Sequence, residues 1–213
     1  KNKKIIIVRK SGLSQGWQDT IFDSSPDKLN NQCSGDTFLN IAEESNLFDK
    51  QGDSLKRATK KLIKKYYEFY QYGTFSGMIK RIIGKTTDED IIKMKIKEYF
   101  SNRLLIVDEY HNLREETESL NDDGSNEVKT ALQNLKKVLM YSENLRVIFL
   151  TATPMFNNAK EIFQLLNLML LNDKRPLINE KDYIDKKTGK INEEGVEIIN
   201  KKCRGYISYL RGE

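Results

Sequence analysis

The chain has 213 residues, 38% of them hydrophobic and 31% charged, a composition typical of a globular protein with one substantial core. Its longest apolar stretch, residues 162–171, is interrupted by Gln164 and Asn167 and is far too short to span a bilayer, so we expect no membrane partner. A net charge of +5 and an isoelectric point of about 9.0 favour an anionic partner such as nucleic acid, although a lysine- and asparagine-rich genome would give the same balance.

The cysteines and the first residues bear on the compartment. Cys33 and Cys203 are too few for a disulfide framework or a zinc site, and they favour a reducing, intracellular environment. The opening Lys-Asn-Lys-Lys leads into only four apolar residues, so we expect no signal peptide. Because the chain opens on Lys1 rather than on Met, we expect it to be a piece of a longer protein.

Strand and helix patterns alternate from the start of the chain. Residues 3–8 are a β-branched run that predicts a buried strand, and residues 13–22 show loose helical spacing. Between them, the basic turn at 9–12 (Arg-Lys-Ser-Gly) is either a phosphate-binding loop or an ordinary strand-to-helix connection. Residues 24–52 predict irregular structure with one short helix near 37–47.

Residues 55–66 predict a helix with an apolar stripe and a basic face. The basic face is either simply solvated or a contact for a nucleic-acid backbone, and it consists of Lys56, Arg57, Lys60, Lys61, Lys64 and Lys65. The aromatic run 67–72 predicts a strand, whose tyrosines are either core residues or a platform for base stacking. Gly73 and Thr74 are predicted to end this strand before a helix over 75–83.

Gly84-Lys85-Thr86 looks like the end of a phosphate-binding P-loop. That loop requires Gly-x-x-x-x-Gly-Lys-Ser/Thr between a strand and a helix, and Ile79 stands where the first glycine should be. The preceding residues predict a helix, and residues 87–90 predict an acidic helix start. We therefore reject this P-loop, and the sequence contains no other candidate.

The clearest strand lies at residues 103–108, after an amphipathic helix over 88–100. Its continuous apolar run suits a strand buried in a parallel sheet, and it ends in Asp108 and Glu109. Because ligands bind outside the carboxyl ends of such strands, these acids are expected at the edge of a site. There, adjacent carboxylates can hold Mg²⁺ through waters and polarise an attacking water. His111, the only histidine, follows two residues later.

A second strand end is predicted to join these acids. Residues 114–126 predict a flexible acidic loop, residues 128–141 a helix, and residues 146–150 a third buried strand that runs into Thr-Ala-Thr-Pro at 151–154. This strand–helix–strand unit predicts a right-handed crossover in a parallel sheet, which puts Thr151 and Thr153 beside Asp108 and Glu109. Residues 159–171 predict a core helix, and a last helix is expected near 193–203.

These residues resemble the motifs of superfamily 2 helicases. Asp108-Glu109-Tyr110-His111 is similar to the DExH form of motif II, and residues 151–154 are similar to motif III. Residues 4–12 resemble the motif Ia strand and loop, and residues 70–75 the neighbourhood of motif Ib. Within the superfamily, the chain most resembles helicase-like transcription proteins of large nucleocytoplasmic DNA viruses, of the poxvirus early transcription factor small subunit and nucleoside triphosphate phosphohydrolase I type.

The resemblance implies an α/β fold with a RecA-like parallel sheet flanked by helices, and an ATP-hydrolysing helicase or translocase that uses ATP and Mg²⁺. It assigns Mg²⁺ to Asp108 and Glu109, largely through water. It assigns positioning or activation of the attacking water to Glu109, and the link to a second domain to His111. Residues implied to couple hydrolysis to movement are Thr151, Ala152 and Thr153. Residues implied to contact nucleic acid are Arg9, Lys10, Ser11, Gly73 and Thr74.

The chain departs from the helicase pattern in one major respect. Motif I, with its phosphate-gripping lysine, is missing, and we expect it upstream of Lys1, with the second helicase domain beyond Glu213. Residues 1–176 are then a partial first helicase domain and residues 177–213 a charged exit segment, and the isolated chain is expected to be inactive.

Three readings stay open. The first is a fragment of a viral helicase or translocase acting in transcription or DNA processing. It would bind DNA rather than RNA, with RNA polymerase or other transcription proteins as further partners, in the host cytoplasm or the virion. The second is a degenerate RecA-like scaffold that binds nucleic acid or RNA polymerase without hydrolysis. The third is an unrelated α/β enzyme with an acid pair.

Overall fold

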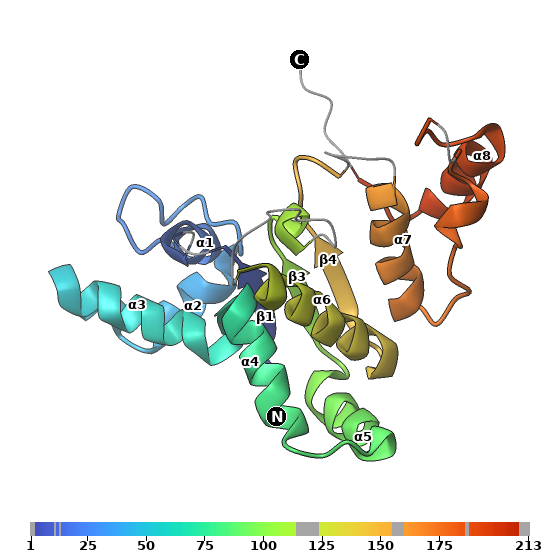
Figure 1. Cartoon of the computed structure of the whole chain (residues 1–213). Helices are drawn as coiled ribbons and strands as arrows, with labels where there is room; N and C mark the ends of the chain where they lie inside the picture. Colours follow the sequence, from blue (N-terminus) through green and yellow to red (C-terminus); the bar gives the residue numbers. More distant parts are fainter. Residues whose placement is uncertain are drawn as a thin grey trace.

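The computed structural model describes residues 3–10, 12, 14–113, 124–154, 160–185 and 188–208. Its centre is a four-stranded parallel sheet in the order β2-β1-β3-β4, with helices on both faces (Figure 1). The strands are β1 (Ile5–Arg9), β2 (Tyr67–Gln71), β3 (Leu104–Val107) and β4 (Arg146–Phe149). The predicted α/β class is confirmed, and the arrangement is consistent with a RecA-like fold.

Every helix predicted from apolar spacing is present among the described residues, with its ends moved by a few positions. The helices are α1 (Ser14–Ile21), α2 (Asp36–Glu44), α3 (Gly52–Tyr66), α4 (Tyr72–Ile83), α5 (Glu89–Phe100), α6 (Gly124–Tyr141), α7 (Lys160–Asn172) and α8 (Glu193–Cys203). The part of the chain that the structure describes also contains three short 3-10 turns, η1 (Leu47–Asp49), η2 (Tyr110–Leu113) and η3 (Glu180–Asp182). None of the described helices is both long and apolar enough to cross a membrane.

Two local predictions are corrected. Gly73 and Thr74 do not separate β2 from α4. They lie in the first turn of α4, where the Thr74 hydroxyl accepts a hydrogen bond from the backbone N–H of Gln71 at 2.8 Å and so satisfies a donor at the helix start. Residues 124–126 were predicted as loop but begin α6. The rest of that predicted loop, residues 114–123, lies outside the described residues.

Gly84 confirms that the Gly-Lys-Thr sequence is no P-loop. It ends α4 with a φ of 75°, a positive value that glycine adopts readily because it has no Cβ. The next helix, α5, begins just beyond, where the Asp88 carboxylate accepts hydrogen bonds from the backbone N–H groups of Asp90 and Ile91. The segment therefore connects two helices, whereas a P-loop connects a strand to a helix.

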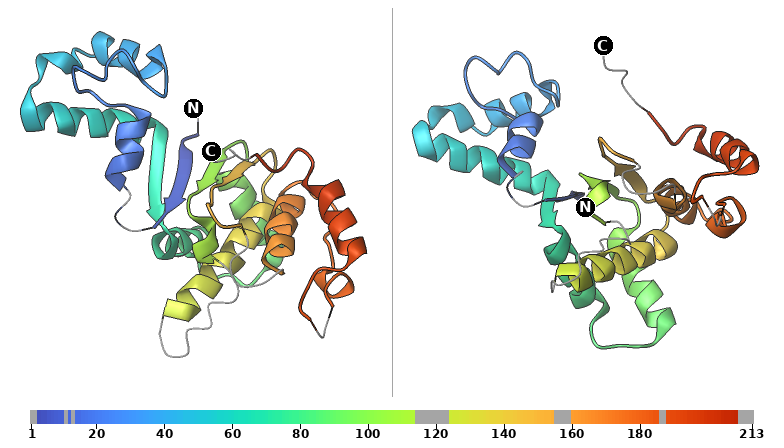
Figure 2. Two further views of the ribbon diagram at one scale, coloured as in Figure 1. Left: turned by 90° about the horizontal axis from the view of Figure 1, so that it is seen from above. Right: turned by 45° about the horizontal axis from the view of Figure 1, so that its top comes forward.

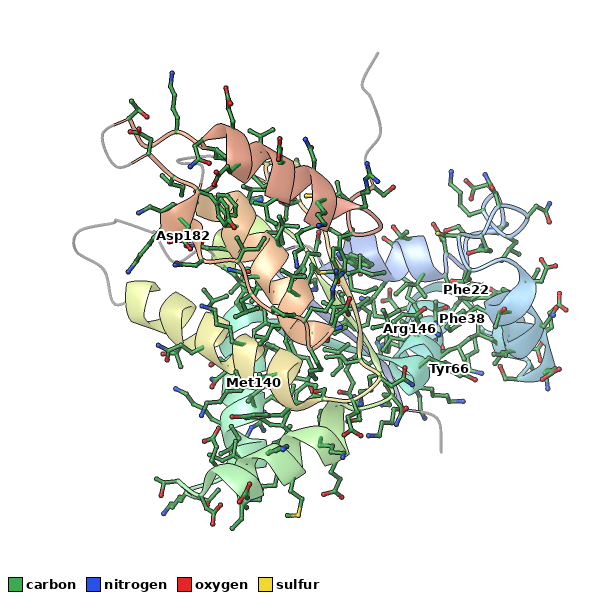
Figure 3. All side chains as sticks on the ribbon, turned by 90° about the vertical axis from the view of Figure 1, so that its right-hand side faces the viewer. Phe22, Phe38, Tyr66, Met140, Arg146 and Asp182 are labelled. Atoms are coloured by element: carbon green, nitrogen blue, oxygen red, sulfur yellow. The ribbon has the colours of Figure 1, made fainter. Side chains whose placement is uncertain are left out.

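The two faces of the sheet bury different sets of helices, because successive side chains of a strand point to opposite sides. Ile6 and Val8 pack with α4, α5 and α6, whereas Ile7 packs with α1, α2 and α3. In the second layer, Phe22 and Phe38 stack with ring centroids 5.9 Å apart (Figure 3). Figure 2 shows α1–α3 at one end of the molecule and α7 and α8 at the other.

Helix α7 belongs to two apolar clusters. Leu168 packs into the core that α4–α6 form on the sheet. Phe163 and Leu166 pack in a separate cluster with Ile178, which residues of α8 flank. The C-terminal elements are therefore attached to the sheet through α7, while the boundary between residues 176 and 177 stays a prediction.

Strand β4 is not the fully buried strand that its apolar sequence predicted. Val147 and Phe149 pack toward α4–α6, but Arg146 is exposed and Ile148 is 44% exposed on the opposite side. The reason is position: β4 is at the edge of the sheet, and the α1–α3 layer covers residues of β1, β2 and β3 only. Within the described part of the chain, no strand pairs with the outer edge of β4.

Candidate active site

The parallel sheet gathers the predicted site residues at one edge, because the carboxyl ends of parallel strands all point the same way. Gly73 and Thr74 follow β2, Lys10 follows β1, Asp108 follows β3, and Thr151 lies two residues beyond β4. Three separate segments of the sequence resemblance therefore lie at the same end of the parallel strands as the acid pair.

The backbone at the end of β3 makes a strained turn. The Asp108 N–H donates to the carbonyl of Val8 at 2.8 Å, and the Tyr110 N–H donates to the carbonyl of Leu150 at 2.9 Å. Between them, Glu109 has a φ of 53°, in the left-handed region that residues with a Cβ rarely adopt. Because of this turn, the two carboxylates contact different residues: that of Asp108 contacts Trp17 of α1, and that of Glu109 contacts His111.

Two aromatic side chains hold this turn. The indole N–H of Trp17 donates to Oδ2 of Asp108 at 2.7 Å. The Tyr72 hydroxyl donates to the carbonyl oxygens of Asp108 and Glu109, the latter at 3.0 Å. Burial raises the pKa of the Tyr72 hydroxyl well above its ordinary value, and the nearby charges of Asp108 and Glu109 raise the pKa further against a lowering effect of Asn112. Tyr72 therefore remains a hydrogen-bond donor throughout the neutral range.

Glu109, His111 and Thr151 form a chain of contacts across the ends of β3 and β4. Nδ1 of His111 lies 3.0 Å from Oε2 of Glu109 and 3.2 Å from Oγ1 of Thr151. Oγ1 of Thr151 also accepts a hydrogen bond from the backbone N–H of Thr153 at 3.1 Å. The Glu109 and His111 side chains are 37% and 30% exposed, so water and a ligand can reach both.

The donor set of this site fits Mg²⁺. Asp108 and Glu109 offer carboxylate oxygens, which are the ligands that Mg²⁺ prefers, and both are only half-buried. Within the described ranges, no group of three or more His, Cys, Asp or Glu side chains could hold a metal ion. A pair is sufficient in principle, because Mg²⁺ usually binds one or two carboxylates and completes its shell with waters and substrate phosphates.

The residues predicted to contact nucleic acid differ in accessibility. Arg9 is 7% exposed, and its guanidinium donates to the carbonyl of Lys10 at 3.0 Å. Lys10, Gly73 and Thr74 are exposed, and Ser11 lies outside the described residues. In this structure, Lys10 is thus the member of the basic turn that offers a charge to solvent, while contact with nucleic acid stays a prediction for all five residues.

Trp17, Tyr72 and Asn112 are site residues for which the sequence indicated no individual role. Trp17, the single tryptophan of the chain, belongs to a helical stripe, and Tyr72 belongs to an aromatic run and to the segment that resembles motif Ib. Asn112 donates from its side-chain amide to the carbonyl of Glu109 at 2.9 Å. The contact between Trp17 and Asp108 joins residues 91 positions apart, so no local pattern could have predicted it.

Comparison with known proteins relates this chain to helicase-like proteins of large DNA viruses. It is 27% identical over 210 residues to a candidate ATP-dependent RNA helicase of Acanthamoeba polyphaga mimivirus, a match that covers 85% of this chain and 16% of that protein. A second candidate ATP-dependent RNA helicase of the same virus is 26% identical over 226 residues, covering 100% of this chain and 34% of the relative.

A candidate helicase of Invertebrate iridescent virus 3 is 26% identical over 209 residues, covering 98% of this chain and 17% of that protein. The chain therefore spans about a third or less of the length of the relatives it matches. No family model matches the chain. No solved structure matches it with significance.

Proposed function

We propose that this chain forms the metal and water side of the ATP site of a nucleic-acid helicase or translocase, of the superfamily 2 DExH type. One observation carries the proposal: Glu109, His111 and Thr151 are in contact at the carboxyl ends of two adjacent parallel strands, directly beside Asp108. The similarity to viral proteins named as helicases supports the same conclusion. The viral transcription or DNA-processing role is part of this proposal.

The roles of the two acids follow from their surroundings. Phosphoryl transfer depends on positioning and on electrostatic stabilisation more than on covalent chemistry. A bound Mg²⁺ would neutralise charge on the phosphates, and Asp108 would hold it with the carboxylate oxygen that Trp17 leaves free. Glu109 would orient the attacking water and accept its proton, because its carboxylate is half-exposed while Tyr72 and Asn112 fix its backbone carbonyl.

His111 is placed to couple the position of Glu109 to that of Thr151 at the end of β4. Its Nδ1 lies within reach of both Glu109 and Thr151, and one ring nitrogen cannot donate its single proton optimally to both. A shift of Thr151 would therefore change the hydrogen bonding of Glu109. Residues 151–153 would in this way couple the state of the nucleotide to movement on nucleic acid.

The proposal requires a phosphate side that these 213 residues do not supply, because the sequence contains no Gly-x-x-x-x-Gly-Lys-Ser/Thr. Among the described residues, no strand pairs with the outer edge of β4, and Ile148 of this strand is 44% exposed. A further parallel strand paired there would end next to Thr151. Such a strand could deliver a phosphate-binding loop to face Asp108 and Glu109.

The test is ATP hydrolysis by a polypeptide in which this chain is joined to the phosphate-binding loop and second RecA-like domain that the proposal requires. We expect turnover that single-stranded nucleic acid stimulates, and a loss of at least about a hundredfold in Glu109→Gln. Glu44→Gln, an exposed acid of α2, is the matched control and should retain the activity. Turnover that survives in Glu109→Gln would contradict the proposal. From this chain alone, we expect no turnover.

A binding scaffold without hydrolysis is the second candidate, and the missing lysine loop is the observation that favours it. The exposed basic face of α3 and the exposed Lys10 would then serve binding to nucleic acid or to RNA polymerase. Binding by such a scaffold would be the same with and without Mg²⁺ and ATP. Comparing single-stranded DNA with RNA of one sequence, over a range of salt concentrations, decides which nucleic acid is preferred.

A further inference from the structure

The single tryptophan of the chain makes a specific contact with the proposed metal ligand. Nε1 of Trp17 lies 2.7 Å from Oδ2 of Asp108, a short distance for an N–H donor and one typical of a charged acceptor. The ring itself is half-buried against the α1–α3 layer of the core. The indole is thus fixed by packing and presents its one polar atom to one oxygen of the acid.

We propose that Trp17 is a positioning residue for Asp108: its indole N–H fixes the carboxylate so that the second oxygen faces the metal. The inference rests on the proposed function, in which Asp108 binds Mg²⁺. Partners that orient a metal-binding carboxylate typically change metal affinity by about ten- to a hundredfold when they are removed. The contact is therefore expected to matter for metal binding as well as for packing.

The position of Trp17 in the chain adds a consequence. Helix α1 directly follows the basic turn at residues 9–12, which carries the exposed Lys10. The same helix holds the indole that orients Asp108. A nucleic-acid phosphate bound at Lys10 and a metal bound at Asp108 would therefore both act on the N-terminal half of one short helix.

The chain provides two single-residue NMR probes for this proposal, because it has one tryptophan and one histidine. The indole N–H of Trp17 and the Cε1–H of His111 each give one resonance, on the two sides of the acid pair. A hydrogen bond to a neutral amide is weaker than one to a carboxylate. In Asp108→Asn we therefore expect the indole N–H resonance to move upfield, and an unchanged resonance would overturn the contact.

Metal binding is tested with Mn²⁺, a paramagnetic cation that takes the same oxygen ligands as Mg²⁺. In the wild-type chain, small amounts of Mn²⁺ should broaden the His111 and Trp17 resonances selectively, and excess Mg²⁺ should reverse the effect. Asp108→Asn should remove the broadening at both residues. Trp17→Phe keeps an aromatic side chain but lacks the N–H. In this variant, about tenfold more Mn²⁺ should be needed to broaden the His111 resonance to the same extent as in the wild type.

The outcomes separate this inference from the proposed function. If His111 broadens at the same Mn²⁺ concentration in wild type and Trp17→Phe, the positioning role is overturned while the metal site stands. If His111 does not broaden in the wild type, the metal site itself is overturned, and the role of Trp17 with it. If Trp17→Phe does not fold, the Asp108→Asn indole shift and the wild-type broadening of Trp17 still decide the contact.

Discussion

Nδ1 of His111 lies 3.2 Å from Oγ1 of Thr151, so two side chains that are 40 positions apart meet at the carboxyl ends of β3 and β4. The strand register explains the meeting, because Val107 pairs with Phe149 and the chain beyond each strand starts at the same level. The Tyr110 N–H then donates to the carbonyl of Leu150, which holds the two strand ends together. A helicase that uses this site would sense movement of one strand end through the other.

Replacing Thr151 by Val should separate hydrolysis from movement. The substitution keeps the shape of the side chain and removes the oxygen that His111 and the Thr153 N–H contact, a loss of about 1 kcal/mol per hydrogen bond. In the joined polypeptide, we expect ATP turnover to stay within about threefold of the wild type while translocation falls about tenfold. Thr87→Val, at an exposed position before α5, is the control. An equal fall in both rates would argue against a coupling role.

The ion pair between Glu68 and Arg103 should contribute more to stability than the pair between Lys97 and Glu143. The first has side chains only 22% and 9% exposed, and Glu68 also accepts from the Tyr99 hydroxyl at 3.0 Å. The second is open to solvent, with side chains 48% and 64% exposed. We expect Glu68→Gln to lower the free energy of unfolding by about 2 kcal/mol.

The matched surface variant is Glu143→Gln, which should cost less than about 0.5 kcal/mol. Urea denaturation of the two variants beside the wild type measures both values. Equal losses would show that burial of the first pair does not strengthen it.

Tyr72 should make the fold sensitive to alkaline pH. Burial holds the pKa of its hydroxyl above the ordinary value of about 10 in the folded state. Below about pH 10, Tyr72 keeps its proton in both the folded and the unfolded state, so its contribution to the free energy of unfolding does not change with pH. Above it, the unfolded state loses the proton first, so stability falls by up to about 1.4 kcal/mol per pH unit. Tyr72→Phe should remove this part of the slope.

The measurement is the free energy of unfolding from pH 8 to about pH 11 for the wild type and Tyr72→Phe. Near neutral pH the variant should be the less stable protein, because the hydroxyl donates to the carbonyls of Asp108 and Glu109. The difference in the free energy of unfolding between the wild type and Tyr72→Phe should become smaller as the pH rises through 10. Tyr66→Phe, on an exposed part of α3, controls for the loss of a phenol. A constant gap would show that Tyr72 ionises alike in both states.

The backbone at Glu109 should favour glycine. With a φ of 53°, any side chain with a Cβ is strained there by about 1 kcal/mol, whereas glycine is not. Glu109→Gly and Glu109→Ala both lose the contact with His111, so their difference isolates the backbone. We expect the free energy of unfolding of the glycine variant to be about 1 kcal/mol higher than that of the alanine variant. Equal stabilities would mean that the turn relaxes once the acid is gone.

The sequence predicted the strands and helices well where apolar spacing alone decides the structure. It also predicted that Asp108, Glu109, His111 and Thr151 lie together beyond the carboxyl ends of the strands, because these ends all point the same way in a parallel sheet. It could not predict that β4 is at the edge of the sheet, because a run such as Arg-Val-Ile-Phe has the same pattern in a central strand. The place of a strand depends on its neighbours, which local sequence does not contain.

Side-chain partners that come from distant segments were equally hidden. Nothing near Trp17 in the sequence indicates Asp108, and nothing near Arg9 indicates that its guanidinium folds back onto the carbonyl of Lys10. An arginine in a basic turn is usually exposed, but Arg9 is the last residue of β1 and is only 7% exposed. Such contacts arise only once the layers have packed, so only the structure contains them.

The outer edge of β4, with which no strand of the described residues pairs, also predicts how this chain behaves in concentrated solution. An unpaired edge strand with apolar side chains is a template for another strand. Ile148 in β4 and Leu150 directly after it are 44% and 39% exposed. A second copy of the chain is the most abundant strand donor in a purified sample. We therefore expect self-association through β4 to be the aggregation hazard of this fold, with the charge of the exposed Arg146 opposing it.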